Sequence, residues 1–160
     1  VDRHHEWRTP VLATTGLDGL PHARTVVLRS AEAQTQQLVF FTDRRSPKVA
    51  ELQTVPAAAF VFWSKRLSWQ LRVRVSTQVH TAGTLVDAAW ARVSQSAAAS
   101  DYLTPHPPGS PLHQPDADNP LAHHLAVVTA QVNHLDWLEL ARDGHRRARL
   151  TPDAAEWLVP

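Results

Sequence analysis

The chain has 160 residues, of which 43% are hydrophobic and 19% are charged, so it can bury one sizeable core like an ordinary globular protein. A net charge of +1 argues against a general nucleic-acid surface, and the absence of cysteine excludes disulfides, thiolate metal sites and a cysteine nucleophile. No apolar run approaches the ~20 residues that span a bilayer, and no signal-peptide pattern opens the sequence. We therefore expect a single domain over residues 1–160, in the cytoplasm, with neither membrane nor nucleic acid as a partner.

The first part of the chain predicts strands joined by short connections. Asp18-Gly19 is a strong hairpin signal between two apolar runs. A short helix is predicted over 47–53, because Ser46 is a good N-cap, Pro47 suits the first helical position and Pro56 follows as a stop signal. The predicted strands in this part are 11–15, 23–30, 37–42 and 57–63.

The clearest strand is predicted over 67–80, where apolar and polar residues alternate from Leu71 to Val79. A period of two over this length is typical of a long antiparallel strand with one face in the core. A helix should follow, with Thr84 as its N-cap and an apolar stripe, and a second helix over 94–103. The stripe consists of Leu85, Ala88, Ala89 and Val93.

The last part of the chain begins with a segment rich in proline, aspartate and glycine over 104–120, which is too long for an ordinary connection and is therefore functional or mobile. A strand is predicted over 122–132. The segments 135–140 and 145–150 form a closing hairpin, and the tryptophan-bearing tail to residue 160 should pack against the domain. The whole pattern predicts a mainly β fold, a six- to seven-stranded antiparallel barrel with short helices.

The stretch FFTDRRSPKVAEL, residues 40–52, leads from a strand into the start of a helix. Backbone N–H groups at a helix N-terminus lack partners and carry partial positive charge. Lys48 in the first turn is locally unfavourable, because the helix dipole favours anions at that end. A bound phosphate would remove this conflict, and the alternative is a solvated turn whose cations keep it soluble.

Other polar residues allow similar pairs of interpretations. Arg24 and Arg29 flank a buried run and point to opposite faces of a regular strand, either toward a cleft and a partner or simply into solvent from an edge strand. Gln70, Arg72 and Arg74 form a polar face that meets solvent or a second subunit. The basic segment 145–149 is typical of a solvated hairpin. The ten histidines show no metal-ligand spacing, and neither the GxSxG nucleophile motif nor a glycine-rich phosphate motif occurs.

Taken in order, five segments resemble the pyridoxamine 5′-phosphate oxidase-like flavoproteins, and most of all their branch of oxidase-related FMN-binding proteins. The segments are RHHEWRTPVLATTGLDGLPHARTVVLR, LVFFTDRRSPKVAEL, FVFW, WQLRVRV, and LDWLEL with HRR, which together span residues 3–149. The resemblance implies an FMN-binding split β-barrel, and a homodimer with two FMN molecules at the subunit interface.

The resemblance also implies which residues contact FMN. One strand wraps the ribityl phosphate and the flavin edge, an aromatic–threonine pair and the helix start follow, a glutamine comes from the other subunit, and late aromatic and basic residues lie near the flavin. The corresponding residues are Arg24, Thr25, Val26, Val27, Leu28, Arg29, Phe41, Thr42, Ser46, Pro47, Lys48, Gln70, Trp137 and Arg147, with Arg149 as the alternative to Arg147.

Departures from the family pattern limit what the resemblance implies. Pro47 stands in place of an arginine that helps to hold the phosphate, and Arg44 or Arg45 is a candidate replacement. In the region that binds the oxidase substrate, Trp90 and Ser94 fall near two expected places, but no arginine match is found. We therefore expect an FMN-dependent oxidoreductase of unknown substrate. The alternatives are a non-catalytic dimeric module for flavin storage or sensing, and a dimeric interaction protein with an empty cleft.

Overall fold

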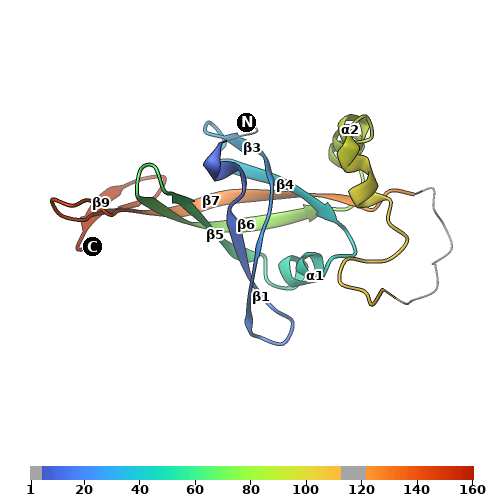
Figure 1. The fold of residues 1–160 in the computed structure, drawn as a ribbon, viewed down its shortest axis with the longest axis horizontal. Helices are drawn as coiled ribbons and strands as arrows, with labels where there is room; N and C mark the ends of the chain where they lie inside the picture. Colours follow the sequence, from blue (N-terminus) through green and yellow to red (C-terminus); the bar gives the residue numbers. More distant parts are fainter. Residues whose placement is uncertain (1–4, 113–121) are drawn as a thin grey trace.

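The computed structural model describes residues 5–112 and 122–160, in which antiparallel strands dominate (Figure 1). All strand pairs are antiparallel and form one nine-stranded sheet with the order β2-β1-β5-β6-β7-β4-β3, extended by β8 on β7 and β9 on β8. None of the described helices is both long and apolar enough to cross a membrane. The elements are η1 (Glu6–Arg8), β1 (Val11–Thr15), β2 (Pro21–Thr25), β3 (Leu28–Glu32), β4 (Gln37–Asp43), α1 (Pro47–Thr54), β5 (Ala57–Ser64), β6 (Trp69–His80), α2 (Thr84–Val93), η2 (Ala97–Tyr102), β7 (Leu125–Glu139), β8 (Arg146–Leu150) and β9 (Ala155–Leu158).

The predicted mainly β, antiparallel class is confirmed, but the number of strands and the closure are different. The single strand predicted over 23–30 is two strands, β2 and β3, which stand at opposite ends of the sheet path. Val26 and Val27 carry the chain from one edge to the other, and the Val26 N–H donates to the carbonyl of Pro10 at 3.0 Å. The hydrogen-bonded sheet is therefore not closed, and the covalent chain bridges its two edges.

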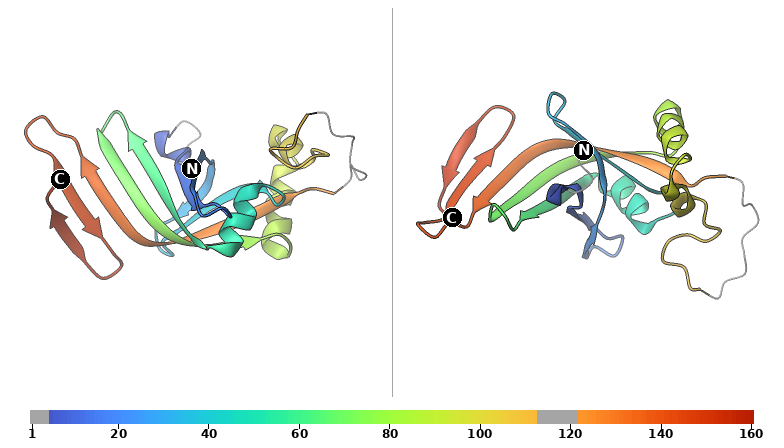
Figure 2. Two further views of the ribbon diagram at one scale, coloured as in Figure 1. Left: turned by 90° about the horizontal axis from the view of Figure 1, so that it is seen from below. Right: turned by 45° about the horizontal axis from the view of Figure 1, so that its top comes forward.

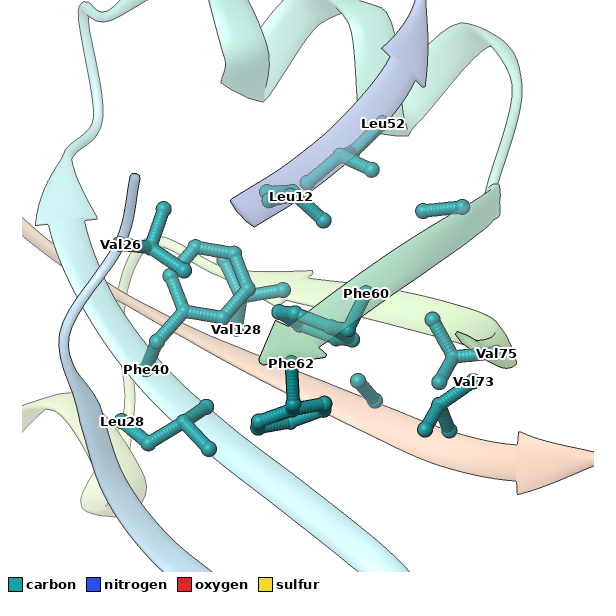
Figure 3. Close-up of a cluster of buried hydrophobic side chains, with 12 residues drawn as sticks. Leu12, Val26, Leu28, Phe40, Leu52, Phe60, Phe62, Val73, Val75 and Val128 are labelled. Atoms are coloured by element: carbon teal, nitrogen blue, oxygen red, sulfur yellow. The ribbon is translucent and has the colours of Figure 1, made fainter. Parts of the chain in front are cut away.

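The main core lies inside the curved sheet, where side chains from both edges and from the middle strands meet (Figure 3). Phe40 and Phe60 have no exposed surface and meet edge to face, with ring centroids 6.1 Å apart. Leu52 of α1 and Leu12 of β1 pack into one end of this cluster. Burial of each such side chain stabilises the fold by about 1.5–3 kcal/mol, so the core fixes where α1 begins relative to β1 and β4.

A smaller apolar cluster lies between α2 and β7. The buried side of α2 consists of Val86, Ala89 and Val93, whereas Leu85 of the predicted stripe is 46% exposed. The N-cap is Gly83, with φ of 92°, and not Thr84. Both stripes have steps of three and four residues, so the apolar surface of β7 decides which one is buried. The second predicted helix is present as the 3-10 helix η2.

The ends of β6 and β7 extend with β8 and β9 as a long arm on the side away from the helices (Figure 2). β7 has 15 residues and includes 135–139 of the segment 135–140, which was predicted as a separate hairpin strand. The prediction that the C-terminal tail packs down is wrong, because Trp157 is 73% exposed and Val159 is 88% exposed. The arm has no second layer beneath it within the described residues, so the tail forms the edge strand β9. The predicted loop over 104–120 is described only as far as residue 112.

Candidate functional site

The turn between β4 and α1 is organised by Asp43. Its carboxylate accepts from the Arg45 backbone N–H at 2.7 Å, and its carbonyl accepts from the Ser46 N–H at 3.0 Å. Ser46 occupies the predicted N-cap position with extended backbone, but its hydroxyl makes no capping bond. The buried Ser46 hydroxyl is therefore available to other groups at the start of the helix.

Lys48 occupies the first turn of α1 and points back over this turn. Its ammonium donates to the hydroxyls of Ser46 at 2.6 Å and Thr42 at 3.0 Å. Burial lowers the pKa of Lys48, and the charge of the neighbouring Arg24 lowers it further, while Glu51 and Asp43 act in the opposite direction. Among the described residues no carboxylate lies within ion-pair distance of this ammonium, because Glu51 and Asp43 are paired with other cations.

Arg24 at the end of β2 is held against the same helix by an ion pair with Glu51. Its guanidinium donates to Glu51 Oε2 at 2.8 Å and also to the hydroxyl of Thr14. Glu51 is only 2% exposed, and it accepts from Thr14 at 2.6 Å and lies 2.7 Å from the His22 ring. Burial alone would raise the pKa of Glu51, but the hydrogen bonds from Thr14 and His22 and the charge of Arg24 lower it.

Arg45, unlike Lys48 and Arg24, contacts the segment that follows η2. Its guanidinium lies 2.7 Å from the carboxylate of Asp43 and donates to the carbonyl of Thr104 at 2.9 Å and that of Pro105 at 3.1 Å. Arg45 therefore attaches the start of the segment after η2 to the turn before α1. Arg45 was one candidate to replace the family's phosphate-binding arginine, which is absent at Pro47. Its guanidinium is instead engaged by Asp43 and by backbone carbonyls.

A hollow of about 290 Å³ lies between the β3–β4 pair and α2. Arg29 lines it with its guanidinium 5.4 Å from the centroid of the Phe41 ring, and its buried Nε has no partner among the described residues. The opposite wall comes from α2 and includes Arg92. Sequence reasoning missed Arg92. Its place four residues after Ala88, on one side of a predicted helix, was the signal that could have identified it.

The remaining predicted cofactor residues divide into two groups. Val26 and Leu28 are buried in the core, whereas Thr25 is exposed at the edge of the sheet and Val27 is half-buried. Only the latter two have side chains available to a ligand. Val26 and Leu28 can therefore contact one only through their backbone.

Gln70, Trp137 and Arg147 are not brought near Lys48 within one chain. Thr42 pairs with Ala126, whereas Gln70 pairs with Leu138, so roughly 40 Å of β7 separates them at about 3.3 Å per residue. At this far end the guanidinium of Arg147 donates to Asp136 at 2.8 Å. The buried indole N–H of Trp137 has no acceptor among the described residues. The predicted cofactor residues of one chain therefore form two separate groups, which we call candidate half-sites.

No metal centre is found in the part of the chain that the structure describes, since no group of three or more histidine or acidic side chains is placed to hold an ion. The two half-sites instead offer cations, hydroxyls, backbone donors and aromatic rings. This donor set suits a ligand that combines a phosphate with an aromatic body.

Comparison with known proteins points to the same kind of ligand. Residues 2–81 match the sequence profile of the family described as "Pyridoxamine 5'-phosphate oxidase, FMN-binding domain". The matched region includes the turn before α1 and the start of β6, and it ends before α2.

Two relatives are pyridoxine/pyridoxamine 5′-phosphate oxidases. That of Chromohalobacter salexigens is 33% identical over 140 residues, which are 86% of this chain and 54% of the relative. That of Thermosynechococcus vestitus is 50% identical over 62 residues, 39% of this chain and 28% of the relative. The chain thus spans about half the length of these relatives, or less.

Among solved structures, a pyridoxamine 5′-phosphate oxidase-related, FMN-binding protein from Nostoc punctiforme superposes with a TM-score of 0.80. The superposition covers 98% of this chain and 90% of that chain, at 24% sequence identity. At this identity the likeness concerns the fold.

Proposed function

We propose, from the premise that this chain belongs to the pyridoxamine 5′-phosphate oxidase FMN-binding family, that it is an FMN-dependent oxidoreductase acting as a homodimer. FMN is the cofactor of this family. One observation carries the proposal: the half-buried ammonium of Lys48 contacts two hydroxyls at a helix N-terminus, beside Arg24, with no carboxylate in ion-pair range among the described residues. A single domain over 1–160 and a cytoplasmic location remain predictions.

The residues at the start of α1 fit the phosphate of FMN. Lys48 and Arg24 supply charge, and the Ser46 hydroxyl and the backbone N–H of Lys48 supply hydrogen bonds, since the Val49 N–H already donates to the Ser46 carbonyl at 2.9 Å. Pro47 carries no N–H group, but the first helical position is where proline is best tolerated. Arg45 is committed to Asp43 and to backbone carbonyls, which leaves the exposed Arg44 as the candidate replacement for the arginine absent at Pro47.

The separation of the two half-sites supports the homodimer. A ligand at Lys48 does not reach Gln70, Trp137 or Arg147 of the same chain, whereas a second copy can present its arm to the first. The arm exposes Trp157 at 73%, and Trp63 of the neighbouring strand β5 is 48% exposed. Exposed apolar groups of this size are typical of a surface that another protein covers.

When bound, FMN supplies the redox chemistry, by accepting and passing on electrons and a hydride. The chain's own residues bind and orient. Lys48 and Arg24 hold the phosphate of FMN. Arg29 lies over the Phe41 ring, beside the hollow between the β3–β4 pair and α2. Arg29 and Arg92 line this hollow from two sides, so we propose that it receives the anionic group of a small substrate.

The purified protein tests the proposal through its visible spectrum and through quenching of FMN fluorescence. We expect flavin absorption, or saturable quenching of added FMN near one equivalent per chain. Absence of both would sink the proposed function. Reduction of the bound flavin is then assayed with nicotinamide cofactors and with anionic amines, and turnover separates an oxidoreductase from a module that only stores or senses flavin.

A further inference from the structure

We propose that Glu51 is a positioning residue for the cofactor phosphate, because its buried carboxylate holds the guanidinium of Arg24 in place beside Lys48. The proposal rests on the proposed function, since it concerns the same site. Glu51 lies on α1, while its partners Thr14, His22 and Arg24 come from the β1–β2 hairpin. One carboxylate therefore joins the helix that starts at the phosphate site to the hairpin that carries the second cation.

Packing alone does not account for a carboxylate at this position. The buried residues of α1 are Val49, Glu51 and Leu52, and the other two are aliphatic. Burial of an ionised carboxylate costs several kcal/mol unless charges and hydrogen bonds offset it. Both oxygens are engaged here, with Oε1 on His22 at 2.7 Å and Oε2 on Thr14 at 2.6 Å and Arg24 at 2.8 Å. An aliphatic residue would fill the space without any of these requirements.

The hydrogen bonds from Arg24 to Glu51 and Thr14 fix the position of its guanidinium. An arginine has five N–H donors in a planar fork, and here one is fixed by Glu51 and one by Thr14. Three donors remain for a ligand, on a side chain whose rotamer is already set. A free arginine loses rotamer entropy when it is ordered, and preorganisation removes this cost from ligand binding. Glu51 also offsets the repulsion between the charges of Arg24 and Lys48 before the anion binds.

A positioning role and a purely structural role predict different results. If Glu51 only attaches the hairpin to α1, its loss should weaken every ligand of the site alike. If it presents Arg24 to a phosphate, its loss should weaken FMN and spare riboflavin, which has the same ring system without the phosphate. The ratio of the two affinities therefore isolates the role.

The experiment titrates FMN and riboflavin, by fluorescence quenching, into the full chain and its Glu51→Leu, Glu51→Gln and Glu32→Leu variants. We expect Glu51→Leu to weaken FMN by about tenfold or more, as for loss of a charge-assisted hydrogen-bond network, and riboflavin by less than about twofold. Glu51→Gln keeps an oxygen that accepts from Arg24, so FMN affinity should return to within about threefold of wild type. Glu32 is exposed, and Glu32→Leu should leave both affinities unchanged.

Thr14→Val supplies a second route if Glu51→Leu does not fold. It removes the hydroxyl that joins Arg24 to Glu51, and we expect a loss of about threefold in FMN affinity alone. Equal losses for FMN and riboflavin in either variant, or an unchanged FMN affinity in both, would overturn the positioning role. A wild-type protein that binds no FMN would overturn the proposed function and this inference together, whereas wild-type binding with an unchanged ratio overturns this inference alone.

Discussion

Basic side chains gather at two ends of the molecule, the arm and the start of α1, but they are paired with carboxylates to different extents. At the arm, Asp136 is 5% exposed and accepts from Arg72 at 2.7 Å and Arg147 at 2.8 Å. Two further arginines there are also paired, Arg146 with Glu139 and Arg149 with Glu156. At the start of α1, Arg24 is paired with Glu51 but Lys48 contacts only hydroxyls. The number of cations thus does not predict an anion site, whereas a half-buried cation with no carboxylate in ion-pair range among the described residues makes the start of α1 the better candidate.

The two ends also complement one another. The start of α1 offers hydroxyls and charge, which suit a phosphate. The arm offers three tryptophans in edge-to-face contact, with ring centroids 5.4 Å apart for Trp69–Trp137 and 6.1 Å apart for Trp137–Trp157. Indole rings of this kind suit a flat aromatic body. If the arm of each copy in a dimer lay against the start of α1 of the other copy, the dimer would contain two complete sites.

The largest expected effect comes from breaking the paired end. Asp136→Ala leaves Arg72 and Arg147, whose side chains are 48% and 28% exposed, without their shared carboxylate. Because it removes their hydrogen bonds to a charged group, each worth about 1.5–3 kcal/mol, we expect the unfolding free energy to fall by about 3 kcal/mol in urea denaturation of the apoprotein. Asp153→Ala, in an exposed turn, is the matched control and should change it by less than about 0.5 kcal/mol. Equal stability of the two variants would remove the contrast between the ends.

Lys48→Ala acts on binding rather than on stability. Loss of hydrogen bonds to a charged phosphate should weaken FMN by about 1.5–3 kcal/mol. The apoprotein should lose little stability, because burial disfavours the charged form of Lys48 and lowers its pKa. Lys65→Ala removes an exposed lysine and serves as the control for net charge. An FMN affinity equal to that of the Lys65 variant would show that the phosphate lies elsewhere.

Dimers that contain one Lys48→Ala chain and one Gln70→Ala chain test whether each site takes residues from both chains. In the proposed dimer each site takes Lys48 from one chain and Gln70 from the other. Lys48→Ala and Gln70→Ala homodimers should both bind FMN weakly, with a loss of about 1 kcal/mol for the glutamine hydrogen bond. After refolding of an equal mixture, half of the dimers are mixed and each has one intact site, so about a quarter of all sites should regain wild-type affinity. No recovery would place Gln70 outside the partner's site.

The smallest effect is the pH dependence of stability. The pKa of Glu51 is lowered from its ordinary 4.5, and that of Asp136 from 3.8, the latter chiefly by the Arg147 hydrogen bond. A lowered folded-state pKa means that the unfolded state binds more protons, so each carboxylate stabilises the fold above its ordinary pKa and loses this contribution as pH falls through the folded value. Glu51→Gln should flatten the acid limb of the urea midpoint against pH. A curve parallel to wild type would contradict the shift at Glu51.

Much of the local structure was predictable from the sequence. β1 matches its predicted bounds, and α1, β4 and β5 differ by one residue, because period-two alternation and proline or glycine punctuation are local signals. Resemblance to the family also identified Ser46 and Lys48, which the structure places in contact at 2.6 Å. What these signals lack is any record of which distant segments meet.

The tertiary structure decided the rest. Val26 and Val27 cross from one sheet edge to the other because the core inside the curved sheet takes Val26, which alternation alone does not reveal. The buried side of α2 depends on the surface of β7, and that choice sets Arg92 opposite Arg29. Glu51 looked like an ordinary helix glutamate until the hairpin placed Arg24 and Thr14 against it. The amino-acid sequence determines which charged side chains the protein has. Packing between distant elements decides which of them form ion pairs, as Arg24 does with Glu51, and which contact only hydroxyls, as Lys48 does.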